Sequence, residues 1–331
     1  MANTQLSTRK PTGKVPYPLI LLEGVEKSGK TYAAAELSGD ARVGRTLWFD
    51  LGEGAADEYA SLGTYEVVNH SGTYDDFLAQ LTAAVNLEHD PAAPTMIVID
   101  SITALWTMLV NEATDRAVRR DKTDANGEPV IGMDLWVTAK RKWRKVLDPL
   151  MSYPGLVVLT ARGKEVAEVN GSRPTGRRLW RVEGEKSLCY DATVWIRYEE
   201  PRKPLLAGVR SLTVDPPQPG GTRELRNFTL SKFVFDELGC DATVTQARDY
   251  RAPTADTIAV RDAQGYVLEA AGGDKVLARE VWDAHHLGDT APAREALTAA
   301  VTDARERAQK ADGDTPADDT QDPATGPQEV A

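Results

Sequence analysis

Short apolar runs alternate with longer amphipathic segments over the first two thirds of the chain. Six runs rich in β-branched or aliphatic residues predict strands at 18–23, 46–50, 65–69, 96–100, 156–160 and 193–198. Between them, residues 74–85 and 133–150 carry apolar side chains at helical spacing and predict helices. This alternation is typical of an α/β fold with a mainly parallel central sheet flanked by helices.

The pattern changes after residue 200. Candidate antiparallel strands at 205–213 and 223–230 flank a proline- and glycine-rich turn at 216–221, and they predict an extension of the sheet. Residues 252–273 are weakly patterned, whereas 274–310 have helical spacing. We therefore expect a small, partly helical appendage after the sheet.

Composition and charge refine this division. The 331 residues are 41% hydrophobic, which is enough for a sizeable core. The formal net charge of -11 argues against a uniformly basic nucleic-acid coat protein, and the last twenty residues contain no Lys or Arg. We expect a flexible N-terminus at 1–15 and a core domain at 16–240. A C-terminal extension would follow at 241–311, and a disordered acidic tail at 312–331.

Cysteine, histidine and hydropathy patterns exclude several classes of protein. Cys189 and Cys240 stand far apart without metal-ligand spacing, which favours reduced thiols in a cytosolic protein. His285 and His286 have no Cys or third His nearby, so we expect surface residues rather than a zinc site. The polar N-terminus lacks the core of a signal peptide, and no apolar stretch approaches the length of a membrane span.

The most informative motif joins the first predicted strand to a helix-prone segment. Residues 24–31 fit the phosphate-loop pattern G-x-x-x-x-G-K-[ST] without a mismatch. Its glycines allow a tight turn, so successive N–H groups and the helix N-terminus point at nucleotide phosphates. We expect Lys30 to reach the β and γ phosphates and Thr31 to hold Mg²⁺. The predicted nucleotide-binding residues are Gly24, Val25, Glu26, Lys27, Ser28, Gly29, Lys30, Thr31 and Tyr32.

Two carboxylates complete the predicted site. Asp100 ends the apolar strand at 96–100, where P-loop ATPases place the aspartate that holds Mg²⁺. Ser101 follows it, so the water-activating glutamate that AAA+ proteins carry at that position must come from elsewhere. We predict Glu53, after the next strand, as the general base, with Asp50 as the alternative. A helix-capping role is the structural alternative for both Asp100 and Glu53.

With these residues in this order, the chain resembles the RecA family of ATPases over about residues 17–200. More narrowly, it is similar to compact RecA-core ATPases that many bacteriophages encode as AAA-type nucleotide-binding proteins, some of which act as recombinases or single-strand annealing proteins. The resemblance implies a RecA-like P-loop fold, ATP and Mg²⁺ as cofactors, and a homo-oligomer with active sites between subunits. From the polar N-terminus and the lack of a membrane-spanning stretch we expect a cytoplasmic location, in a bacterium or a phage-infected one.

A basic segment between the strands at 156–160 and 193–198 corresponds in order to the family's DNA-binding loop. We expect a mobile loop whose arginines neutralise phosphates and whose exposed tryptophan stacks on a base. The predicted DNA contacts are Arg162, Lys164, Arg173, Arg177, Arg178, Trp180 and Arg181. Several glutamates share the segment, so an ordinary solvated hairpin is the alternative.

We therefore expect a Mg²⁺-dependent ATPase that acts on single-stranded DNA in recombination, annealing or replication, with hydrolysis stimulated by DNA. Two alternatives come from other classes: a nucleotide-dependent scaffold or switch that binds a protein partner without DNA, and a small-molecule P-loop kinase. The acidic tail is either a solubilising end or a segment that competes with DNA or recruits a partner protein.

Overall fold

The computed structural model describes residues 8–88, 90, 92–121, 123–124, 126–170, 173–250, 260–284 and 297–305. The chain divides into two compact units, Met1–Arg251 and Ala252–Ala331. The first unit has a hydrophobic core on each face of its sheet, and the second unit has a core of its own.

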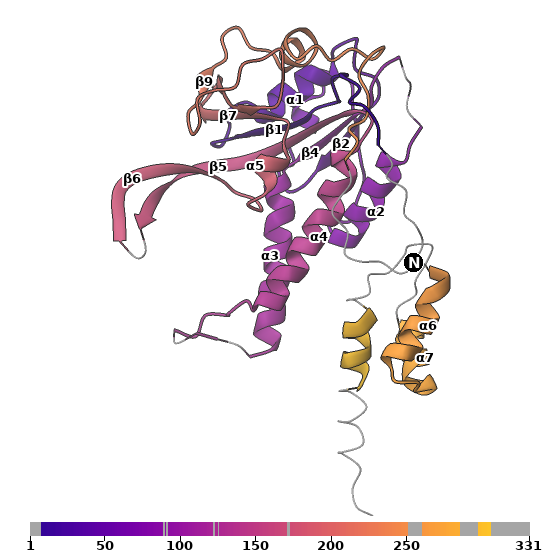
Figure 1. Ribbon diagram of the computed structural model, residues 1–331. Helices are drawn as coiled ribbons and strands as arrows, with labels where there is room; N and C mark the ends of the chain where they lie inside the picture. Colours follow the sequence, from indigo (N-terminus) through magenta and orange to yellow (C-terminus); the bar gives the residue numbers. More distant parts are fainter. Residues whose placement is uncertain are drawn as a thin grey trace, which may run out of the picture. The chain divides into compact units, whose positions relative to one another are not determined.

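The first unit is built on one sheet, which has nine strands in the described part of the chain. The strands are β1 (Leu19–Gly24), β2 (Thr46–Asp50), β3 (Glu66–Val67), β4 (Met96–Asp100), β5 (Leu156–Asn170), β6 (Arg173–Val182), β7 (Val194–Glu200), β8 (Lys203–Val209) and β9 (Arg223–Glu224). Their order is β3-β2-β4-β5-β1-β7-β8-β9. Outside this order, β6 pairs with β5 (Figure 1). All pairs from β3 to β7 along this order are parallel, whereas β6, β8 and β9 join antiparallel. The predicted α/β fold with an antiparallel extension is confirmed.

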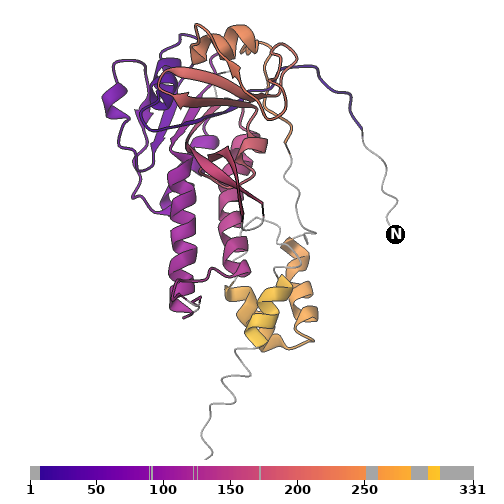
Figure 2. The same ribbon diagram turned by 90° about the vertical axis from the view of Figure 1, so that its left-hand side faces the viewer.

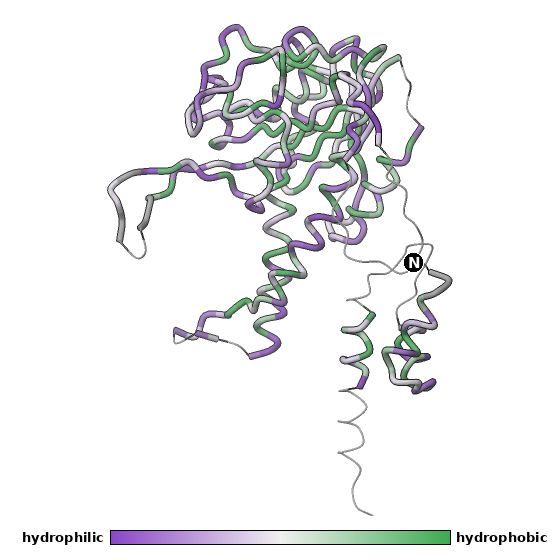
Figure 3. Tube along the Cα trace, in the orientation of Figure 1, coloured by the Kyte–Doolittle hydropathy of each residue, from purple (hydrophilic) through white to green (hydrophobic). Residues whose placement is uncertain are grey.

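Helices cover both faces of this sheet. They are α1 (Lys30–Ser38), α2 (Tyr74–Val85), α3 (Ile102–Arg119), α4 (Met133–Met151) and the short α5 (Leu188–Asp191), with a 3-10 turn at Asp57–Tyr59 and a π-helix at Lys232–Glu237. One core packs α1 and the π-helix on one face, and a second packs α2, α3 and α4 on the other. Because both faces are covered, the central strands are largely apolar, apart from buried polar residues such as Glu23, Asp100 and Thr160, and hydrophobic residues gather in the interior of this unit (Figure 3).

Capping side chains set the start of two of these helices. The Thr73 hydroxyl accepts a hydrogen bond from the Asp76 N–H at 3.4 Å and begins α2. The Ser101 hydroxyl accepts one from the Ala104 N–H at 3.3 Å and begins α3, which lies beside α4 (Figure 2). Ser101 therefore caps α3, and the capping role considered for Asp100 is wrong.

Three predictions for this unit need correction. The strand expected at 65–69 is only Glu66–Val67, because at the sheet edge it pairs with β2 over two residues. The strand expected at 223–230 ends at Glu224, and the chain then turns toward the π-helix. The loop expected after residue 160 is an antiparallel ribbon of β5 and β6, the hairpin considered as the alternative (Figure 1). Charged residues do not prevent this ribbon, because cross-strand hydrogen bonds satisfy its backbone. The charged side chains that the structure describes on it stay exposed: Arg162, Lys164, Glu165, Arg178 and Arg181.

The second unit is helical where it is described. It contains α6 (Val260–Ala270), α7 (Lys275–Ala284) and helical residues 297–305, which bury Val267, Val281 and Val301 together. The weak pattern at 252–273 hid α6, because its core positions are mostly alanine and valine. The rest of the helix predicted at 274–310, His285, His286 and the acidic tail lie outside the described residues. Among the helices described in either unit, none has both the length and the apolar character required to cross a membrane.

Candidate nucleotide-binding site

The predicted site residues gather where the parallel strands of the sheet end. In register, Gly24 of β1 lies opposite Arg162 of β5, and Asp50 of β2 lies opposite Asp100 of β4. A cleft of about 630 Å³ runs along this edge, and its lining includes Lys30, Thr31, Glu53, Asp100, Ser101, Thr160, Arg162 and Lys164. The carboxyl ends of parallel strands are where open α/β sheets bind ligands, so the predicted residues occupy the expected edge.

The phosphate loop connects β1 to α1 through a tight turn. Gly29 has φ 105°, a conformation that favours glycine, and a Cβ at Gly24 would lie 2.2 Å from the Tyr198 carbonyl oxygen. The Lys30 ammonium donates to the Val25 carbonyl at 2.8 Å and to the Gly24 carbonyl at 3.3 Å. Burial lowers the pKa of Lys30, and nearby carboxylates oppose this effect. A nucleotide phosphate would offer the ammonium a charged acceptor in place of these neutral ones.

The oxygens of Thr31 and Asp100 form the candidate metal site. The Thr31 hydroxyl donates to Asp100 Oδ2 at 2.9 Å, and the Thr160 hydroxyl donates to Oδ1. Asp100 is buried, and desolvation raises the pKa of its carboxyl above the usual value. Hydroxyl, carboxylate, phosphate and water oxygens are the ligands that Mg²⁺ prefers, so the donor set fits this ion. In the described residues no cluster of three His, Cys, Asp or Glu side chains could hold a metal.

Glu53 and Asp50 have different surroundings. Asp50 accepts the backbone N–H groups of Gly54 at 2.9 Å and Ala56 at 3.3 Å, so its carboxylate folds the loop after β2. Glu53 lines the cleft, and its Oε1 accepts from the Ser101 hydroxyl at 3.0 Å and from Arg162 Nη2 at 2.9 Å. Of the two carboxylates, Glu53 is the one that lines the cleft.

A second cavity of about 400 Å³ borders the other side of the phosphate loop. Tyr32, Tyr59 and Phe228 contribute aromatic side chains to its wall, and the Tyr32 and Tyr59 rings meet edge to face at 6.3 Å. The Arg202 N–H donates to the Ser28 carbonyl at 3.0 Å and ties this wall to the loop. Aromatic walls of this kind suit a nucleoside base. The sequence predicted Tyr32 alone, because Tyr59 and Phe228 come from segments without a recognisable motif.

The predicted DNA contacts lie on the β5–β6 ribbon, which leaves the sheet at the cleft. Each of the following cations is paired with an acid: Arg162 with Glu53, Lys164 with Glu183, and Arg178 with Glu165. Arg181 is exposed and lies opposite Lys164 in register. Trp180 is half-buried, and its indole N–H donates to Glu23, so the exposed tryptophan expected from the sequence is wrong. The side chains of Arg173 and Arg177 lie outside the described residues.

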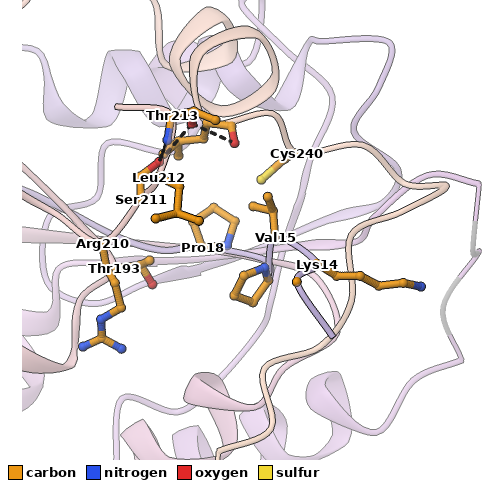
Figure 4. A pocket seen from close by; sticks show the side chains of 12 residues that line it. Lys14, Val15, Pro18, Thr193, Arg210, Ser211, Leu212, Thr213 and Cys240 are labelled. Carbon is orange, nitrogen blue, oxygen red and sulfur yellow. Dashed lines mark hydrogen bonds between the residues drawn. The ribbon is translucent and has the colours of Figure 1, made fainter. Parts of the chain in front are cut away.

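Another cavity, of about 240 Å³, lies at the opposite end of β1 (Figure 4). Val15, Pro18, Thr193, Leu212 and Cys240 are among its lining residues. Pro18 and Thr193 directly precede β1 and β7, so this cavity is at the amino ends of the strands and apart from the predicted site. Burial raises the pKa of Cys240 to about 12, which keeps this thiol protonated and unreactive.

Comparisons with known proteins bear on this site. A family model described as an AAA domain matches residues 17–186, which include the phosphate loop, Glu53 and Asp100. One similar solved structure is a prototypical ATPase from the type III secretion system of pathogenic bacteria, with 14% identity, 54% of this chain and 51% of that chain covered, and a TM-score of 0.33. Another is the type III secretion ATPase EscN of enteropathogenic E. coli, with 8% identity, 87% and 67% covered, and a TM-score of 0.33. The chain spans about half the length of the first structure, and likeness at these scores adds nothing to the fold described above. A search of curated proteins finds no match.

Proposed function

This chain belongs to the AAA domain family, and we propose that it hydrolyses ATP with Mg²⁺ and acts on single-stranded DNA through the β5–β6 ribbon. The observation that carries the proposal is the cleft that brings Lys30, Thr31, Asp100 and Glu53 to one edge of the sheet. We further propose that the protein acts in recombination or annealing as a homo-oligomer, in which a cation from a neighbouring subunit completes the open side of the cleft.

Each cleft residue has a separate role in this proposal. The loop N–H groups and Lys30 bind the phosphates and offset charge on the transferring group. Thr31 and Asp100 hold Mg²⁺, which when bound neutralises further phosphate charge. Glu53 orients the attacking water and accepts its proton. Since Ser101 and Arg162 both bond to Glu53 Oε1, Oε2 is the oxygen that would receive the proton.

Two features of the ribbon support DNA as its ligand. Arg162, Gly163 and Lys164 line the cleft, so the ribbon begins inside the site. Across the ribbon, Lys164 and Arg181 lie directly opposite each other. Like charges in that arrangement repel each other. Glu183 already pairs with Lys164, so the phosphates of a nucleic-acid backbone would chiefly offset the charge of Arg181.

The second candidate function is a nucleotide-dependent switch that binds a protein partner. It is favoured by the acids already paired with ribbon cations and by Leu179, which is 48% exposed on β6. A protein partner would contact the apolar side chains of the ribbon, whereas DNA would contact its cations through phosphates.

Hydrolysis and DNA-binding assays separate these functions. ATP turnover is measured with Mg²⁺, with and without a single-stranded oligonucleotide, for the wild type, Lys30→Ala and the control Lys145→Ala, whose side chain is exposed on α4. We expect the wild type and the control to hydrolyse ATP and to do so faster with DNA. We expect no ATP turnover by Lys30→Ala. Normal turnover by Lys30→Ala would remove the assigned site.

Gel shifts across salt then test the ribbon. We expect Arg181→Gln to weaken binding and to lower the salt slope by about 1, as loss of one phosphate contact does. The control is Lys203→Gln, an exposed lysine on β8. Turnover with no gel shift under any nucleotide condition would favour the switch.

A further inference from the structure

Glu23 is a carboxylate buried between the phosphate loop and the ribbon. Its side chain is 0% exposed, and it directly precedes Gly24, the first residue of the loop. In register it lies opposite Ala161, the residue of β5 that precedes Arg162. A carboxylate in such a place is stable only if hydrogen-bond donors satisfy its oxygens, so its partners indicate its role.

Donors from two other strands bind both oxygens of Glu23. The indole N–H of Trp180, on β6, donates to Oε2 at 2.6 Å. On β7, Trp195 Nε1 and Arg197 Nε donate to Oε1 at 3.0 Å and 2.7 Å. The Arg197 guanidinium also lies over both indole rings, 5.3 Å and 5.0 Å from their centroids. Glu23 therefore joins the strand of the phosphate loop to β7 and to the ribbon.

Glu23 packs closely against the ribbon, with no space for an added methyl group at Gly163. A Cβ at Gly163 of β5 would lie 2.1 Å from Glu23 Oε2 and 2.7 Å from Trp180 Nε1. Burial raises the pKa of Glu23, and hydrogen bonds from Trp180 and Arg197 oppose that rise. If Trp180 moved away, Oε2 would lose a donor inside the protein, which is unfavourable. A displacement of Glu23 must therefore be followed by Trp180 and, with it, β6.

We propose that Glu23 is a positioning residue that couples nucleotide binding at the phosphate loop to the β5–β6 ribbon. The proposal rests on the proposed function in that the loop binds ATP. Nucleotide phosphates accept hydrogen bonds from the backbone N–H groups that follow Gly24. Because Glu23 is joined to Gly24 by one peptide bond, a rearrangement of the loop on binding would displace Glu23 as well. Trp180 transmits the displacement to β6. This coupling is reciprocal. If bound ATP changes the affinity of the ribbon for its ligand by some factor, that ligand changes the affinity of the phosphate loop for ATP by the same factor.

The test uses the full chain with Mg²⁺ and a non-hydrolysable ATP analogue, and it requires no DNA. Hydrogen–deuterium exchange of peptides from β5 and β6 is measured with and without analogue at a concentration that saturates each variant. Glu23→Gln removes the charge that holds Trp180. Glu199→Gln is the matched control, because Glu199 accepts from the same Arg197, at 3.3 Å, from within β7. Gly163→Ala is a second variant, which forces Glu23 and Trp180 apart with all charges unchanged.

We expect the analogue to slow exchange in the ribbon by about fivefold or more in the wild type and in Glu199→Gln. In Glu23→Gln and Gly163→Ala we expect bound analogue without that response. An unresponsive ribbon in the wild type, or an undiminished response in the folded variants, overturns the coupling. Calorimetry measures analogue binding separately, so failure of the wild type to bind it contradicts the proposed function as well. If circular dichroism shows that Glu23→Gln is unfolded, Gly163→Ala decides with the carboxylate in place.

Discussion

Substituting Asp50, the last residue of β2, and Glu53, in the loop that follows, tests which of the two carboxylates activates water. Glu53→Gln keeps the size of the side chain and an oxygen for the Ser101 hydroxyl, but it cannot accept a proton. A general base contributes about 10²- to 10⁴-fold to the rate. At about 1.4 kcal/mol per tenfold, we expect a loss of about 3 to 5 kcal/mol of transition-state stabilisation, seen as a lower kcat. Arg162 loses an ion pair, but it is 55% exposed, so the stability cost is below about 1 kcal/mol.

Asp50→Asn is the matched substitution. Asn keeps one carbonyl oxygen for the N–H groups of Gly54 and Ala56, which the two carboxylate oxygens bind in the wild type. Losing one such bond to a charged acceptor costs about 1.5 to 3 kcal/mol of unfolding free energy. We therefore expect lower stability and a kcat within about tenfold of the wild type, because Asp50 acts only through the loop that carries Glu53.

Steady-state hydrolysis at saturating Mg²⁺-ATP gives kcat and KM, and urea unfolding gives the stability of each variant. Glu58→Gln is the control for general effects of removing a charge, since Glu58 lines the same cleft. The assignment is refuted if Glu53→Gln retains wild-type kcat, or if Asp50→Asn loses as much kcat as Glu53→Gln while its stability is unchanged.

Four further substitutions, one of them a control, test the metal site, the core and the phosphate loop. Asp100→Asn should abolish Mg²⁺-dependent hydrolysis yet unfold less readily than the wild type at pH 7 without metal. Burial raises the pKa of Asp100 in the folded state, so the wild type loses stability as pH rises through that pKa. Urea unfolding from pH 4 to 8 should therefore show that the difference in unfolding free energy between Asp100→Asn and the wild type shrinks toward low pH. Trp143→Ala, at a fully buried site, should cost about 3 to 5 kcal/mol of unfolding free energy, and Met133→Ala, which is 78% exposed, less than about 0.5 kcal/mol. Gly24→Ala should lose ATP binding, measured with a fluorescent analogue, because its Cβ would collide with the Tyr198 carbonyl.

The parts of the fold that could be predicted are those with a strong local signal. Helix α2 and strands β2 and β4 have the predicted bounds, because their apolar spacing is regular and their ends carry polar residues. The edge strands β3 and β9 are two residues long, and their extent depends on the neighbouring strand rather than on their own residues. Propensity alone does not set such lengths.

The site divides in the same way. The phosphate loop, Glu53 and Asp100 could be found because motif and strand order specify them along the chain. Thr160 and Glu23 could not, because the partners that give them a role come from distant segments. One signal for Glu23 was present: a single acid at the end of an otherwise apolar strand, LILLEG, must find donors if that strand is central.

The ribbon is held to the nucleotide cleft on both of its strands. On β5, Arg162 pairs with Glu53, the candidate base, and on β6, Trp180 donates to Glu23, which adjoins the phosphate loop. A mobile loop could bind a ligand without consequence for either carboxylate. A paired ribbon cannot bind a ligand in this way, because a shift of its strands changes the surroundings of both Glu53 and the phosphate loop. The replacement of the expected loop by an anchored ribbon therefore strengthens the argument that the ribbon's ligand, whether DNA or protein, acts on ATP hydrolysis.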